Sequence, residues 1–420
     1  MQTPIEGERH FKNPYPDADH EQRLFVLDGQ LCDPWKSLIF REVLQIHSKI
    51  NLAYTERQID THDYSCYTGI TGIGLLEKKL ADDLNVNTEQ KKLIRSSSKA
   101  KIEKAVSKVR KKRLTFLCGD AGPLALGAKM YDQHGEKKKS AACIQNLVKV
   151  KYDGIDDYGK PIPDEILYGK AGYLYALLYV KQTIGPETIP NEVVKVVVES
   201  IILSGQSARK GRLYFEWHGK EYIGAAHGYI GIYYMLLQAM IICPSSVDSK
   251  TCELIKEGIN WLLDQRFPSG NIASSIGSDT DRLVHWCHGA PGAVHLFALG
   301  YNVFGDSKYL EAAKKCAEVL WERGLLGKGH GLCHGAAGNG YGFLCLYQLT
   351  GDTNYLWKAI KFAEWCLDRD NHDCRVPDRP FSLFEGLAGT AYFLADMLEP
   401  DKARFPAFQL VSYKDYVYKL

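Results

Sequence analysis

The sequence has little net charge, no apolar segment near its start and few long uncharged runs. Its 420 residues carry a formal net charge of +2, and 24% of them are charged, which is ordinary for a globular protein. This charge balance gives no indication of a nucleic acid as partner. The opening residues, MQTPIEGERHFKNPYPDADHEQ, lack the apolar stretch of a secretory signal, and Gln2 stands where N-myristoylation requires glycine.

These absences predict a cytoplasmic protein, and they are also compatible with a peripheral membrane or nuclear association. In a reducing compartment the 12 cysteines are expected to be thiols or metal ligands rather than a disulfide framework. One run, residues 222–243, has 22 residues without a formal charge and is long enough to span a bilayer. The comparable runs are shorter or contain carboxylates, so we expect no transmembrane segment.

A short pattern, Gly-x-x-Gly followed by an apolar run, occurs seven times. Successive copies begin 46 to 61 residues apart. A period of about 50 residues is the length of two helices with two connections, so the repeating unit is a helical hairpin. The first glycines of the seven copies are Gly69, Gly119, Gly169, Gly228, Gly289, Gly335 and Gly386.

The segments between the motifs differ from the motif helices. Residues 307–324 and 353–369 are charged and amphipathic, as surface helices are, whereas the motif helices are apolar on every side and should be buried. The sequence therefore predicts an all-α protein, an α/α toroid with a double ring of seven helical hairpins. We expect residues 1–50 to hold the first outer helix, residues 51–410 to form one barrel domain and residues 411–420 to be a tail.

The motifs all lie at the junction of a loop and an inner helix, so they should gather at one end of the toroid around a common cavity. There the free N–H groups and positive ends of the helix dipoles would face inward. No aliphatic residue precedes the first glycine in any copy, which predicts the wall of a site. The residues at this position are Thr68, Cys118, Tyr168, His227, His288, His334 and Glu385.

Two neighbouring copies carry cysteine and histidine together, as WCHGAPG and LCHGAAGNGY. Cys287 and Cys333 occupy the same motif position, and His334 follows directly. Two thiolates and one imidazole are a donor set for zinc, and three protein ligands leave a coordination position for water or substrate. We expect one zinc ion per chain at these residues, with His288 as a neighbouring acid, base or structural group.

The motifs FLCGDAGPLA, LYGKAGYLYALL, GAAHG, LVHWCHGAPG, GLCHGAAGN and PFSLFEGLAGT resemble the lanthionine synthetase C-like (LanC-like) family, the eukaryotic relatives of bacterial lantibiotic cyclases. The resemblance runs from RHFKNPY, near the start, to KARFPAF. It implies zinc bound by Cys287, Cys333 and His334, and it identifies His227 with the acid/base histidine of the family.

The resemblance further implies that glutathione is bound by Arg9, by Lys328 and by the loop formed by Arg375, Val376, Pro377 and Asp378. Glu165 stands where bacterial cyclases carry a catalytic aspartate and is a second catalytic candidate. The implied reaction is Michael addition of the glutathione thiol to dehydroalanine or dehydrobutyrine residues of peptides or proteins. A histidine titrating near neutrality can protonate the resulting enolate.

Three other functions compete with this hypothesis. A glycosidase could use Asp120, Glu165 and Glu385, but this alternative leaves the paired cysteines without a role. A protein prenyltransferase would share the toroid and the zinc, although such enzymes typically complete the donor set with a carboxylate. A non-enzymatic glutathione-binding adaptor or redox-signalling protein could recruit signalling partners through the basic residues 91–113.

Overall fold

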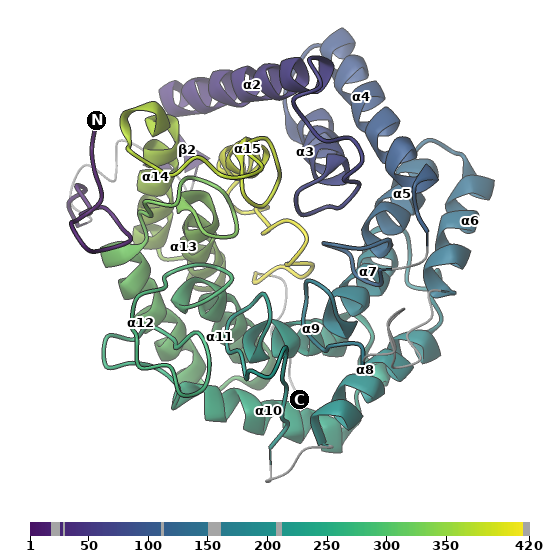
Figure 1. The fold of residues 1–420 in the computed structure, drawn as a ribbon, viewed down its shortest axis with the longest axis vertical. Coiled ribbons are helices and arrows are strands. Elements are labelled where there is room, and N and C mark those ends of the chain that lie inside the picture. Colours follow the sequence, from purple (N-terminus) through teal and green to yellow (C-terminus); the bar gives the residue numbers. More distant parts are fainter. Residues whose placement is uncertain (18–25, 28–29, 111–112, 150–160, 207–211, 415–420) are drawn as a thin grey trace.

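The computed structural model describes residues 1–17, 26–27, 30–110, 113–149, 161–206 and 212–414. Within these ranges the helices form two concentric rings, so the predicted all-α toroid of helical hairpins is confirmed (Figure 1). The inner ring consists of α3 (Ile70–Asp83), α5 (Ala121–Gln133), α7 (Lys170–Thr183), α9 (Tyr229–Ile242), α11 (Ala290–Phe304), α13 (Ala336–Thr350) and α15 (Leu387–Asp396). The outer ring consists of α2 (Asp33–Thr55), α4 (Thr88–Ser107), α6 (Lys137–Val148), α8 (Asn191–Gln206), α10 (Ser249–Leu263), α12 (Ser307–Arg323) and α14 (Thr353–Leu367).

The ring is closed by helices from opposite ends of the chain. Helix α15 packs against α2, which precedes the first motif, so the seventh hairpin is completed in space rather than in sequence. Helix α2 continues past residue 50, where we expected the barrel domain to begin. Two short helical turns, η1 (Pro244–Ser246) and η2 (Arg369–Asn371), and an antiparallel pair, β1 (Val26–Leu27) with β2 (Gln30–Leu31), complete the described elements.

Inner and outer helices differ in burial as their sequences predict. In α9 residues 229–240 are all buried, whereas α12 buries one face through residues such as Ala313, Ala317 and Leu320. The long uncharged run is split between a loop and α9, which has 14 residues. In the described part of the chain, no helix is both long enough and apolar enough to cross a bilayer.

The second glycine of every motif allows a close backbone approach. A Cβ atom at any of these positions would overlap the carbonyl oxygen of the residue six positions earlier in the chain. Glycine is therefore required for the loop to fold back onto the start of the inner helix. The seven glycines are Gly72, Gly122, Gly172, Gly231, Gly292, Gly338 and Gly389.

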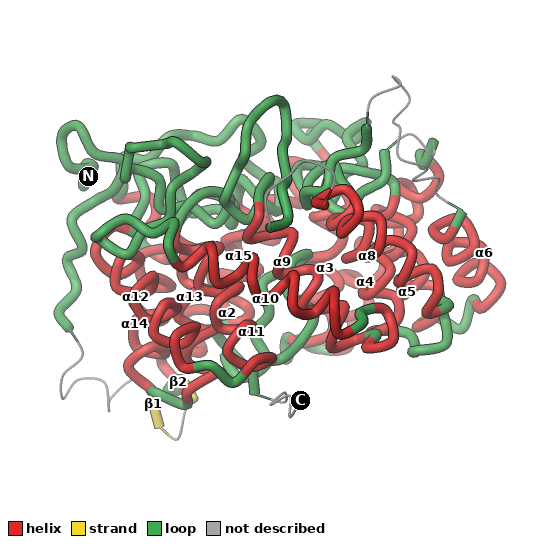
Figure 2. The backbone as a smooth tube through the Cα atoms, turned by 90° about the horizontal axis from the view of Figure 1, so that it is seen from below, coloured by secondary structure: helices red, strands yellow, loops and turns green. Residues whose placement is uncertain are grey.

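The chain beyond α15 enters the middle of the ring (Figure 1). Phe405, Phe408 and Tyr413 are buried there, and Gln238 of α9 accepts a hydrogen bond from the Leu410 amide and donates one to the Phe408 carbonyl. The first residues of the predicted tail are thus part of the core, while residues 415–420 lie outside the described residues. Figure 2 shows that many loops gather on one face of the ring.

Candidate metal and catalytic site

A belt of hydrogen bonds joins the motif junctions around the ring. Its members lie two positions before the first glycine, and each donates its amide to the carbonyl of a neighbouring junction: Ala226 to Cys287 at 3.3 Å, Cys287 to Cys333 at 3.3 Å, Cys333 to Phe384 at 2.8 Å, Phe384 to Tyr67 at 3.1 Å and Tyr67 to Leu117 at 2.9 Å. The α7 junction is joined through the neighbouring Ile166 amide, which donates to Ala226. Cys287 and Cys333 are therefore adjacent because they are consecutive members of this belt.

A cavity of about 250 Å³ opens at this end of the toroid. Its wall includes three of the residues that directly precede a first glycine, but residues of the belt and of the loops contribute as much. The described residues that line it are Arg9, Tyr67, Leu167, Ala226, His227, Leu283, His285, Cys287, His288, Lys328, Cys333 and His334.

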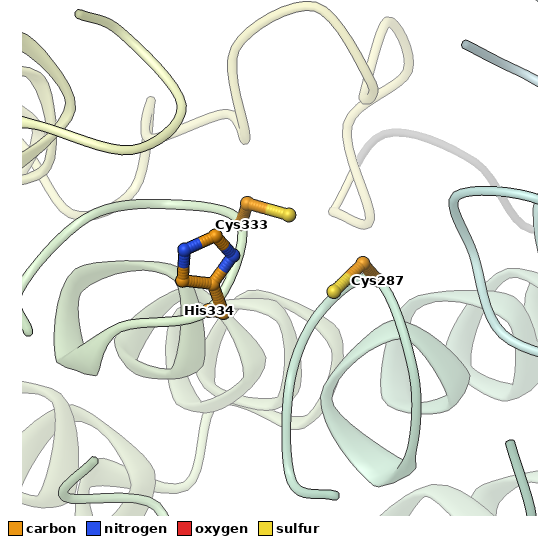
Figure 3. A group of neighbouring side chains, drawn as sticks. All are labelled: Cys287, Cys333 and His334. Carbon is orange, nitrogen blue, oxygen red and sulfur yellow. The ribbon is translucent and has the colours of Figure 1, made fainter. Parts of the chain in front are cut away.

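Three of these residues form a cluster suited to a metal ion (Figure 3). One ligand atom each from Cys287, Cys333 and His334 lies within 4.8 Å of the other two. Cys287 and Cys333 are 9% and 3% exposed. Among the described residues no further histidine, cysteine or carboxylate joins this group, so the donor set matches that of a zinc site with three protein ligands.

The protein environment alone does not favour thiolates here. Burial raises the pKa of the Cys333 thiol well above its ordinary value, the adjacent Cys287 adds to the shift, and His334 opposes it. A bound cation would reverse this balance, because a metal-coordinated thiol is deprotonated.

His227 is held in one orientation by Glu165. The Nδ1 atom of His227 lies 2.8 Å from Glu165 Oε2, and the Glu165 carboxylate also accepts the amides of Leu167 at 2.9 Å and Tyr168 at 2.5 Å. Glu165 is 2% exposed and serves as acceptor in all three contacts, so Nδ1 carries the hydrogen. The Nε2 atom of His227 is then the one that can exchange a proton with a substrate.

Three aromatic side chains lie near the His227 ring. The indole of Trp217 stacks on the imidazole with ring centroids 4.0 Å apart and planes at 4°. Tyr168 lies nearly parallel to both rings, and Tyr222 contacts both His227 and His288. We call Tyr168, Trp217 and Tyr222 the aromatic wall.

Two further histidines in the cavity are uncharged at neutral pH. Burial lowers the pKa of His285 to about 3, with a further contribution from Lys328, and burial lowers the pKa of His288 to about 4, with a contribution from His227. In the described structure His285 Nε2 and His288 Nδ1 are buried without a hydrogen-bond partner.

Of the cationic side chains expected to bind glutathione, two line the cavity and one lies outside it. Arg9 and Lys328 line the cavity, and the Gly327 amide donates to the Arg9 carbonyl at 2.9 Å, which joins the two segments. Arg375 is joined to the same segment through its amide and the Gly327 carbonyl, but its side chain is 61% exposed and pairs with Asp378 at 3.0 Å.

The neighbours of Arg375 also lie outside the cavity wall. Val376 is 75% exposed, and Pro377 is half-buried. The loop of residues 375–378 thus lies beside the Lys328 segment.

The carboxylates required by the glycosidase alternative do not converge. Neither Asp120 nor Glu385 is among the described residues that line the cavity, and Glu165 is engaged by His227. Thr68 and Cys118 are likewise absent from that wall, and the Thr68 hydroxyl donates to Asp63 at 2.6 Å.

Three of the basic side chains in residues 91–113 form ion pairs within the fold. Lys101 is 3% exposed and contacts Glu77 at 2.7 Å, Lys99 contacts Glu136 at 2.5 Å, and Arg95 lies 3.4 Å from Asp82. Residues 111–112 of this stretch lie outside the described residues. Lys101 is buried and cannot contribute to a docking surface of this stretch.

Sequence reasoning missed Tyr67, His285 and Trp217. Tyr67 and His285 were detectable in principle, because Tyr67 occupies the belt position of its repeat and His285 lies two residues before Cys287. Trp217 lies in the connection between two motifs, where the repeat pattern carries no information.

Comparisons with known proteins agree with this architecture. The family model described as lanthionine synthetase C-like protein matches residues 60–410. The chain is 40% identical over 416 residues to the Danio rerio protein named glutathione S-transferase LANCL1, covering 96% of this chain and 99% of that protein. Nisin cyclase superposes with a TM-score of 0.65 at 16% identity, covering 85% of this chain and 93% of its own, and shows the shared fold.

Proposed function

Because the chain belongs to the lanthionine synthetase C-like family, we propose that it is a glutathione transferase acting on dehydroalanine and dehydrobutyrine residues of peptides or proteins. The sulfur of glutathione loses its hydrogen and bonds to the β-carbon, while the double bond between the α- and β-carbons becomes a single bond. The α-carbon takes up a proton, and the product is a thioether. A relative named as a glutathione S-transferase supports this assignment. The observation that carries it is the convergence of two cysteines and two histidines, His334 and His227, on one cavity.

Cys287, Cys333 and His334 would hold one zinc ion per chain. Their donor atoms are of the right type and lie close enough for small side-chain movements to bring them onto one ion. When bound, zinc supplies the positive charge that deprotonates an incoming thiol at neutral pH. The two cysteines are nearly buried, which keeps competing water away from the sulfurs.

His227 would deliver the proton to the α-carbon. Glu165 holds the hydrogen on Nδ1, so that Nε2 gives up its proton to the enolate and regains one from the thiol or from solvent. Glu165 thus acts as a positioning residue, a narrower role than the catalytic one expected from the sequence.

Arg9 and Lys328 would bind the carboxylates of glutathione. Both side chains reach the cavity that holds the cysteines, so an anionic thiol docked on them has its sulfur near the metal ligands. Arg375 would extend this surface from the neighbouring loop. A reducing compartment such as the cytoplasm suits this chemistry, because all twelve cysteines, each within the described residues, are free thiols.

The test combines metal analysis with turnover of a dehydroalanine peptide by glutathione. We expect about one zinc per chain in the wild type, loss of zinc and product in Cys287→Ala and Cys333→Ala, and retained zinc in the control Cys252→Ala on α10. A wild type that turns over the peptide without metal would refute the mechanism. Bound zinc and glutathione with no turnover at any zinc occupancy would favour the adaptor instead.

A further inference from the structure

Trp217, one residue of the aromatic wall, begins a strained turn. Trp217 and Lys220 exchange both backbone hydrogen bonds, at 3.0 and 3.2 Å, around His218 and Gly219, whose φ angles are 50° and 73°. Two positive φ angles define a type I′ turn. A non-glycine residue such as His218 adopts this conformation only at some cost, and such strain tends to persist at functional sites. The turn fixes the Trp217 indole against His227.

The wall continues beyond the contact with His227 onto the surface. Tyr168 is 46% exposed, and Trp217 is half-buried. Support of the His227 ring requires one face of one indole. The exposed Tyr168, which stacks on Trp217 from the other repeat, is not needed for that support, so the surface is larger than a structural role demands.

The two substrates of the proposed reaction differ in chemistry, and two sets of residues at the site differ as well: Arg9 and Lys328 line the cavity, whereas the aromatic wall presents stacked rings, with Lys220 over Tyr222. Arg9 and Lys328 accompany the metal ligands and suit the anionic glutathione. The wall accompanies His227, where the α-carbon of the other substrate must lie to receive its proton. An aromatic surface binds apolar side chains and planar amides better than it binds carboxylates.

We propose that the aromatic wall docks the peptide that carries the dehydroamino acid, and that Trp217 and Tyr168 select peptides with an apolar side chain next to it. The peptide lies across the wall with its reactive α-carbon toward His227 Nε2, while glutathione enters from the cationic side. This inference rests on the proposed function, since it names the second substrate of the same site. Trp217 and Tyr168 determine specificity rather than move a proton.

Two matched peptides test the proposal, one with phenylalanine beside dehydroalanine and one with serine in its place. We expect the wild type to show a KM about fivefold to tenfold lower for the phenylalanine peptide, as a single aromatic contact allows. In Trp217→Ala and Tyr168→Ala this preference is lost, while the KM for glutathione and the zinc content are unchanged. The control Tyr355→Ala, on the outer helix α14, keeps the preference.

A structural role for Trp217 would give a different result. If Trp217→Ala lowers kcat equally for both peptides and shifts the pH profile while the KM ratio stays as in the wild type, Trp217 supports His227 only and the docking proposal is wrong. Trp217→Phe should restore most of the preference. Equal KM values for the two peptides in the wild type would also overturn the proposal.

Binding without chemistry separates this proposal from the proposed function. Calorimetry with the phenylalanine peptide carrying alanine instead of dehydroalanine measures docking alone. Binding that weakens about fivefold to tenfold in Trp217→Ala supports the aromatic wall even where no turnover is seen, and then the proposed function fails by itself. Turnover in the wild type with equal peptide affinity in Trp217→Ala refutes the docking proposal by itself.

Discussion

The two parts of the cavity wall are built alike but differ in chemistry. The junctions of α11 and α13 contribute Cys287 and Cys333 and lie with the cations of Arg9 and Lys328. The junctions of α7 and α9 contribute Leu167 and Ala226 at the same belt positions, beside the aromatic wall, where Trp217 stacks on His227 and Lys220 lies over the Tyr222 ring. The repeats thus supply a nearly symmetric frame, and function arises where equivalent positions carry different side chains.

The proton-transfer pair should show the largest effect after the metal ligands. His227→Ala is expected to lower kcat about 10²- to 10⁴-fold, because the proton donor is lost, and Glu165→Gln about 10- to 100-fold, because the ring loses its orientation and its negative partner. Steady-state rates at saturating glutathione measure this. Both variants should retain zinc. Loss of zinc in His227→Ala would show that the part of the cavity around His227 and the part around Cys287 and Cys333 are not independent.

The cationic part should control glutathione affinity rather than rate. Arg9→Ala and Lys328→Ala are each expected to raise the KM for glutathione about tenfold, with little change in kcat or in the KM for peptide. Added salt should reduce the difference from the wild type, because these charges are partly exposed. Lys314→Ala on the outer helix α12 is the control. An equal rise in the KM for peptide would contradict the division of substrates.

The smallest expected effect concerns histidines away from the metal ligands, and it separates stability from chemistry. Burial lowers the pKa of His295 to about 3, and burial together with His372 and Arg369 lowers the pKa of His330 to about 3. Below about pH 6.5 these histidines bind protons in the unfolded chain but not in the folded chain. The free energy of unfolding therefore falls as pH falls, by about 1 kcal/mol per histidine at pH 5.5.

Urea unfolding at pH 7.5 and pH 5.5 measures this loss. The urea midpoint of the wild type should be lower at pH 5.5 than at pH 7.5. The midpoint of His295→Gln should fall less, because glutamine removes one of the histidines that are protonated only in the unfolded chain. An identical drop in His295→Gln would show that His295 does not contribute. Rates measured above pH 6.5 then report on His227 without interference from unfolding.

Much of the fold could be predicted because its determinants recur. Seven Gly-x-x-Gly motifs at a steady period indicated the hairpins, and the apolar character of segments such as α9 separated inner from outer helices. The pairing of α15 with α2 and the burial of Phe405 and Tyr413 in the ring were not predicted. These contacts join segments that are distant in sequence and follow no period.

The candidate site was predictable where it obeys the repeat. Cys287 and Cys333 share a motif position, and the belt of hydrogen bonds makes equivalent positions neighbours in space. Trp217 and the contact between Glu165 and His227 do not follow the repeat, so nothing in the motif spacing marked them.

The sequence by itself determined the toroid and the register of the candidate ligands Cys287, Cys333 and His334. Backbone packing at glycine and helix periodicity are local properties that recur in each repeat. The tertiary structure decided which side chains complete the cavity. Arg9 reaches the cavity from the start of the chain, and Trp217 stacks on the cavity residue His227 from a turn between repeats. Both contacts depend on how distant segments pack together.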